Sequence, residues 1–168
     1  AGTFYTSATL APKGFVFNKV GAQTFSYAGA NSDYNSYTVA NTSTLQLLTG
    51  LTISSLSGPS SSFTVNGTLD AGTFIINGGA TNGSFILASG ATLKSSNTNG
   101  IVSTTVGTIS NTIATRTFND AANYEFYGGA AVTNTSFPNS VMNNLTISNT
   151  AGVTQGGAIT VNGNLTIA

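Results

Sequence analysis

The chain has 168 residues, and only eight of them are charged, four basic and four acidic, so the formal net charge is zero. Nucleic-acid binding is disfavoured because it needs clustered Lys and Arg. The sequence contains no His and no Cys, which excludes Ser-His-Asp and Cys-His catalysis, His or Cys zinc sites and disulfides. No apolar run approaches the about 20 residues of a membrane helix, and an uncharged surface does not oppose self-association.

The beginning of the chain is repeated in its middle. Residues 1–4 read Ala-Gly-Thr-Phe, and the apolar segment 15–17 follows ten residues later. Residues 71–74 also read Ala-Gly-Thr-Phe, and the apolar segment 85–87 follows at the same spacing. The shared motif and spacing indicate an internal duplication.

Four further matches occur in the same order in both halves of the chain. They pair residues 26–30 with 126–130, 41–43 with 134–136, 51–54 with 145–148, and 64–69 with 160–165. We therefore predict two solenoid repeat copies, residues 1–70 and residues 71–168, with an insertion in the second copy within 88–120.

The stretch 63–95 divides into three lines of eleven residues, which begin with Phe63, Phe74 and Phe85. An aliphatic residue follows each Phe two places later, and residues two apart share one face of a strand. A short strand, a corner and another strand at a fixed period are typical of a β-solenoid. No apolar pattern of helical period is long enough to predict a helix. The expected fold is all-β, a parallel β-helix or solenoid with uncapped ends.

Asn-Gly pairs occur five times, beginning at residues 66, 77, 82, 99 and 162. Both residues tolerate positive φ, so these pairs predict corner turns. Stacked Asn residues at such corners would form ladders of side-chain amides.

Two groups of aromatic residues lie at equivalent places in the two copies; they are Tyr27, Tyr34, Tyr37, Tyr124 and Tyr127. One interpretation is a platform on which glycans stack. The other is packing between neighbouring turns, with each hydroxyl reaching water. The sequence leaves both open.

Catalysis would have to use the four carboxylates, Asp33, Asp70, Asp120 and Glu125. We interpret them as solvated surface charges and expect neither an enzyme, nor a cofactor, nor a metal site. A glycosidase-like pair assembled from distant turns is the alternative. The sequence also lacks regular Thr-x-Thr rows, so it does not predict an ice-binding face.

The two ends of the chain are complementary. Joining residue 168 of one copy to residue 1 of another nearly recreates the interior junction around residues 65–74. A cut through a longer repetitive protein would look the same. Uncapped solenoid ends favour head-to-tail growth by β-augmentation. The predicted subunit interface consists of Ala1, Gly2, Thr3, Phe4, Leu165, Thr166, Ile167 and Ala168.

Residues 143–167 resemble the repeats of large secreted bacterial surface proteins, the adhesin-like β-helices exported by type IX secretion. Residues 85–93 and 124–130 are similar to the same repeats. The resemblance implies an extracellular parallel β-helix with a structural or adhesive role and supplies no catalytic residues.

The function expected from these patterns is structural. The chain would polymerise with itself, head to tail, into an extracellular filament or sheath on the cell surface. The first alternative is a repeat segment of a large adhesin that binds surface glycans, and the second is a carbohydrate-active β-helix enzyme. Neither nucleic acid nor a membrane span is expected.

Overall fold

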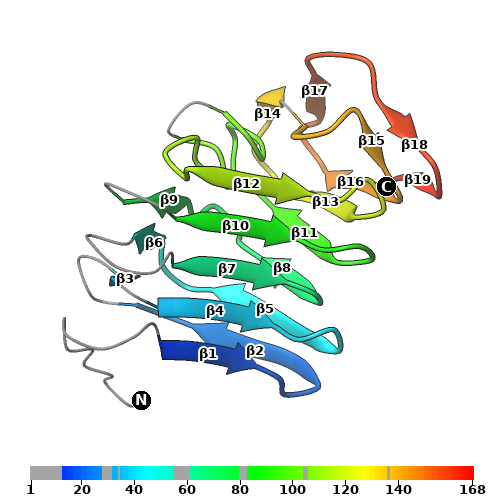
Figure 1. Ribbon diagram of the computed structural model, residues 1–168. Helices are drawn as coiled ribbons and strands as arrows, with labels where there is room; N and C mark the ends of the chain where they lie inside the picture. The colour runs from blue at the N-terminus through cyan, green and yellow to red at the C-terminus, as the bar shows by residue number, and fades with distance from the viewer. Residues whose placement is uncertain are drawn as a thin grey trace.

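The computed structural model describes residues 13–27, 32–33, 35–54, 61–79, 83–103, 106–135 and 137–168. Within these ranges it contains nineteen β-strands and no helix. Figure 1 shows the strands stacked as successive turns of a coil. All pairings between the described strands are parallel. The predicted all-β solenoid is confirmed.

Two long sheets form the sides of the coil, and only the seven-stranded one continues to the last strand, β19 (Leu165–Ile167). The five-stranded sheet consists of β1 (Lys13–Phe17), β4 (Asn35–Val39), β7 (Ser62–Val65), β10 (Ser84–Leu87) and β12 (Thr115–Phe118), in that order. The seven-stranded sheet consists of β2 (Gly21–Phe25), β5 (Ser43–Leu47), β8 (Thr68–Asp70), β11 (Thr92–Ser95), β13 (Asn123–Gly128), β16 (Leu145–Asn149) and β19 (Leu165–Ile167). Neighbouring strands in each sheet come from successive turns, of which there are about six.

Shorter sheets complete the turns. A three-stranded sheet contains β3 (Ser32–Asp33), β6 (Leu51–Ser54) and β9 (Ile76–Gly78). Two pairs lie near the C-terminal end: β14 (Val132–Thr135) with β17 (Val153–Gln155), and β15 (Val141–Met142) with β18 (Thr160–Val161).

The length of a turn varies along the coil, as the register of the seven-stranded sheet shows. Thr68 pairs with Thr92, and Thr92 pairs with Asn123, so these two turns take 24 and 31 residues. Part of the extra length follows β11. There Ile109 forms an isolated parallel bridge with Ile76 of β9. The N–H of Ile109 also donates a hydrogen bond to the carbonyl of Ile101. This long turn overlaps residues 88–120, while the duplication into two copies stays a prediction.

The interior is built from side chains at alternate positions of the two main sheets. Phe15, Tyr37, Phe63 and Phe85 are register partners, and their stacked ring centroids lie 5.4, 5.6 and 6.0 Å apart. A second buried column contains Leu45, Leu69 and Leu93. Phe74 does not join the aromatic column, because one turn contains two of the eleven-residue lines. The first line, 63–73, contains most of β7 and all of β8, whereas the second line, 74–84, contains β9.

The Asn-Gly pairs at 66, 99 and 162 lie in bends or turns, as predicted, and Asn82 of the pair at 82 falls outside the described residues. At 77 the prediction of a turn is wrong, because Asn77 and Gly78 belong to β9. Glycine is needed there for space, since a Cβ on Gly78 would clash with the backbone oxygen of Thr112. Side-chain amides of two neighbouring turns do bond at Asn123, whose Oδ1 accepts hydrogen bonds from Asn143 and Asn144. The next contact, from the backbone N–H of Asn164 to Asn144 Oδ1, no longer joins two amide side chains.

Candidate functional site

The last strand of the seven-stranded sheet has one open edge. β19 pairs with β16 on one side, and no described strand pairs with its other side. Leu165 lies in register with the buried Leu145, and Ile167 lies in register with Ile147. Nevertheless Leu165 is 57% exposed and Ile167 is 73% exposed. The edge therefore presents unpaired backbone groups beside apolar side chains that belong to a core column.

The opposite edge of the same sheet is β2. Gln23 of β2 begins a column of register partners that continues through Leu45, Leu69, Leu93, Tyr124 and Leu145 to Leu165. Phe25, two residues along β2, is half-buried against Phe17 and Tyr37. The two edges thus carry the first and last members of the column that runs from Gln23 to Leu165.

The predicted interface residues fall into two groups. Leu165, Thr166, Ile167 and Ala168 lie at the open edge just described, and all four are exposed. Ala1, Gly2, Thr3 and Phe4 lie outside the described residues. The interface itself stays a prediction.

The five tyrosines do not form one surface. Tyr37 and Tyr124 point into the core, where they are 1% and 2% exposed, so they pack between turns. Tyr27 follows β2, whereas Tyr127 lies on β13, four strands away in the seven-stranded sheet, and both are half-buried. Tyr34 lies outside the described residues. Burial raises the pKa of Tyr124, and the nearby Asp120 adds to the effect.

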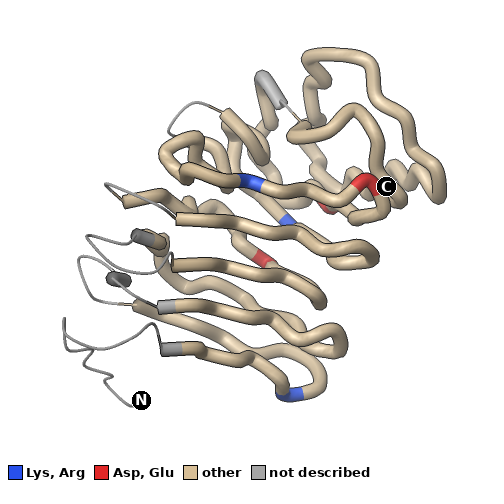
Figure 2. The backbone as a smooth tube through the Cα atoms, viewed as in Figure 1, with Lys and Arg blue, Asp and Glu red and all other residues tan. Residues whose placement is uncertain are grey.

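A column of charged residues on the outer face of the seven-stranded sheet was not predicted. Asp70, Lys94 and Glu125 are register partners on three neighbouring strands. Lys94 Nζ lies 3.2 Å from Glu125 Oε2 and 5.6 Å from the ring centroid of Tyr127. The Tyr127 hydroxyl donates a 2.6 Å hydrogen bond to Asp70 Oδ1. Figure 2 shows how few other charged positions the described chain has.

The charged side chains of this column are paired with one another or with nearby hydrogen-bond donors. The Gly72 N–H also donates to Asp70 Oδ1, and Asp120 lies in the turn before β13, where it accepts a hydrogen bond from Asn139. In the described part of the chain, no cluster of three or more His, Cys, Asp or Glu is placed to hold a metal ion. The arrangement links neighbouring turns electrostatically and offers no open carboxylate pair in a cleft.

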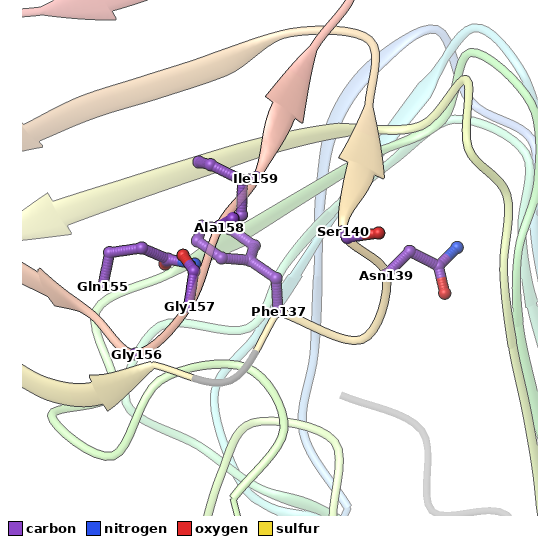
Figure 3. A pocket seen from close by; sticks show the side chains of 8 residues that line it. All are labelled: Phe137, Asn139, Ser140, Gln155, Gly156, Gly157, Ala158 and Ile159. Carbon is purple, nitrogen blue, oxygen red and sulfur yellow. The ribbon is translucent and has the colours of Figure 1, made fainter.

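A shallow pocket of about 230 Å³ lies between the chain segments 137–140 and 155–159. Figure 3 shows Phe137 directed toward Ala158, whereas Asn139 and Ser140 point away from them. Asn139 donates to the Phe118 carbonyl and to Asp120, and Gln155 donates to the Gly157 carbonyl. The side-chain amides of Asn139 and Gln155 are thus used within the protein and do not converge on a ligand position.

Among the described residues, no helical segment has the length and apolarity that crossing a bilayer would need. Comparison with known proteins gave no match, whether with protein-family models, with curated proteins or with solved structures.

Proposed function

We propose that the protein is a structural, extracellular subunit that assembles end to end into a surface filament or sheath. The observation that carries the proposal is the open edge of β19, where Leu165 and Ile167 continue core columns and yet are exposed. Pairing this edge with another strand would satisfy its backbone groups and bury both side chains.

A second copy of the chain supplies a matching edge. Continuing the register across the joint would place Leu165 against Gln23 of the next copy, because the two residues occupy one column. Ile167 would then lie against Phe25, since each is two residues further along its strand. On the outer face Thr166 would meet Thr24, since both belong to the column of Asp70 and Lys94. Neither β2 nor β19 contains a charged residue, so no charge on the two strands opposes the pairing.

The five-stranded sheet stops before this end of the coil, because the chain continues from β12 through β13 to β19. Its last strand, β12, carries Arg116 at an inward position opposite Phe85. The Arg116 side chain is half-buried, and its Nη1 has no hydrogen-bond partner among the described residues. Inward-pointing charges on edge strands discourage pairing with another chain. Growth is therefore assigned to the seven-stranded sheet.

The joint is a heterologous contact, because it uses different surfaces on the two copies, and such contacts form open filaments when they do not close. Burying apolar area is worth about 25 cal/mol per Å² before the costs of association. The extracellular location is supported by the near absence of charge, the lack of Cys and the resemblance to secreted surface repeats.

The test compares two lysine substitutions on β19 by sedimentation velocity and negative-stain electron microscopy at neutral pH. The wild-type protein should form oligomers whose size grows with concentration. Ile167→Lys places a charge in the inward column and should give monomers. Thr166→Lys adds the same side chain to the outer face of the same strand and should still assemble.

A mixing experiment distinguishes end-to-end growth from any symmetric contact. Gln23→Lys blocks the opposite edge and should also be monomeric. An equimolar mixture of Ile167→Lys and Gln23→Lys retains one free end of each kind and should form dimers that grow no further. A wild-type protein that stays monomeric at high concentration would overturn the proposal, as would equal effects of Ile167→Lys and Thr166→Lys.

A further inference from the structure

The outer face of the five-stranded sheet carries two regular columns of uncharged, non-aromatic residues. The first column contains Gly14, Ser36, Ser62, Ser84 and Thr115, and the second contains Val16, Thr38, Thr64, Ile86 and Thr117. All ten occupy the outward positions, alternating with the core residues of the same strands. None of the ten is charged or aromatic, so this face differs in kind from the charged outer face of the seven-stranded sheet.

The second column is built from β-branched residues on all five strands. Val, Ile and Thr have a restricted χ1 because two heavy atoms branch from Cβ. Their methyl groups, and the hydroxyls of Thr38, Thr64 and Thr117, are therefore held in repeating positions. Neighbouring strands lie about 4.8 Å apart, and alternate residues along a strand lie about 6.6 Å apart. The face is thus a grid of methyl and hydroxyl groups with two fixed spacings.

The hydroxyls of this grid are free to bind water. In the described ranges no hydrogen bond joins the hydroxyls of Ser62, Thr64 or Ser84 to another protein group, and the same holds for the hydroxyls of Ser36, Thr38, Thr115 and Thr117. Figure 1 shows β1, β4, β7, β10 and β12 side by side, with no described segment drawn in front of them. Water bound to these groups would repeat with the spacings of the grid.

We infer that this face binds the surface of ice. Oxygen atoms on the prism faces of ice also repeat along two directions at intervals similar to those of the grid. Water ordered by the hydroxyls would merge with such a surface, while the methyl groups would occupy the spaces between. A crystalline polysaccharide is favoured less, because aromatic side chains, on which sugars stack, are absent from the ten outward positions.

The sequence pattern does not reveal these two columns, because their residues do not repeat as Thr-x-Thr. Residues 36–38 and 62–64 have the pattern Ser-x-Thr, residues 84–86 have Ser-x-Ile, and residues 115–117 have Thr-x-Thr. The gaps between them also differ, so the alignment emerges only when the strands pair. The inference concerns the side of the coil and does not depend on how its ends assemble.

The test measures thermal hysteresis, the shape of ice crystals and incorporation of the protein into a slowly growing ice front. The wild-type protein should depress the freezing point below the melting point, facet the crystals and enter the ice. Thr64→Lys interrupts the centre of the second column and should abolish all three effects. Thr44→Lys makes the same change at a half-buried outward threonine of the seven-stranded sheet and should leave them unchanged.

Thr38→Ser keeps a hydroxyl and removes one methyl group, so it should reduce hysteresis without affecting the fold, which circular dichroism checks for every variant. A folded wild-type protein without hysteresis would overturn the inference. So would binding to insoluble chitin or cellulose without hysteresis, or a loss of hysteresis in Thr44→Lys equal to that in Thr64→Lys. Side-by-side dimers that Thr64→Lys dissolves, without any effect on ice, would assign the face to a second copy instead.

Discussion

The Tyr127 hydroxyl donates a hydrogen bond of 2.6 Å to Asp70 Oδ1, although the two residues lie on β13 and β8 with β11 between them. This bond therefore connects two turns that are not neighbours. Each strand otherwise bonds to the turn immediately above or below, so the contact adds a constraint that the sheet ladder does not provide.

Removing this bond should lower the stability of the fold. Tyr127→Phe keeps the ring that lies beside Lys94 but leaves a half-buried Asp70 with one donor fewer. A hydrogen bond to a charged group contributes about 1.5–3 kcal/mol, so the loss should be about 1–2 kcal/mol after partial replacement by water. Urea unfolding measures the change. An unaltered free energy of unfolding would show that the bond is not maintained in solution.

Stability should also fall in alkaline solution. Burial, followed by the hydrogen bond to Asp70, raises the pKa of Tyr127 from 10.0 to about 12. Between these values the unfolded chain has released the proton while the folded protein retains it, so the contribution of Tyr127 is complete below pH 10 and is lost as pH rises toward 12. Urea midpoints at pH 8, 10 and 11 should decrease in the wild type. They should decrease less steeply in Tyr127→Phe, where the raised pKa of Tyr124 remains.

Two phenylalanines that look equivalent in the sequence should differ in their contribution to stability. Phe63 is fully buried between Tyr37 and Phe85, whereas Phe74 is half-buried outside that column. Phe63→Ala should cost about 3–5 kcal/mol because it leaves a cavity in the aromatic column. Phe74→Ala should cost clearly less. Equal losses in the free energy of unfolding of the two variants, measured by thermal or urea unfolding, would contradict a turn built from two eleven-residue lines.

The corner at Gly67 should not accept a side chain. A Cβ there would clash with the backbone oxygens of Ala40 and Ser43 in the turn below, and backbone atoms cannot move aside without breaking strand pairing. Gly67→Ala should therefore destabilise the protein by about 2 kcal/mol or more. Gly14→Ala is the matched control, since a Cβ at Gly14 meets nothing within 4 Å. Calorimetric melting temperatures of the two variants provide the comparison.

The sequence was sufficient to predict the solenoid because its eleven-residue lines in 63–95 repeat at a constant length. Phe63 and Phe85 are indeed register partners. It was not sufficient to predict the role of Phe74, because the eleven-residue period counts lines and says nothing of how many lines make one turn. The turn predicted at Asn77-Gly78 was wrong for a related reason. Glycine is also needed where another segment of the same chain passes closely, and here that segment, at Thr112, lies 34 residues further along.

The columns of residues on the outer faces of the two sheets could not be predicted from the sequence, for a geometric reason. Which residues become neighbours across strands depends on the length of every turn, and the turns that bring Asp70, Lys94 and Glu125 together differ by seven residues. An error of one residue in either turn would move a side chain to the opposite face. Leu165 and Ile167 of β19, in contrast, belong to the segment for which the sequence predicts a subunit interface, and they are exposed; the interface itself stays a prediction.

The spacing of strand partners also determines how the chain can fold. In the seven-stranded sheet each strand finds its partner 20 to 31 residues away, so no step requires closing a loop much longer than one turn. A pair of adjacent turns anywhere along the coil can therefore act as a nucleus, from which ordering spreads in both directions. Opening should proceed inward from the outermost turns, and amide protons of β7, β8 and β10 should exchange with solvent more slowly than those of β2 and β19.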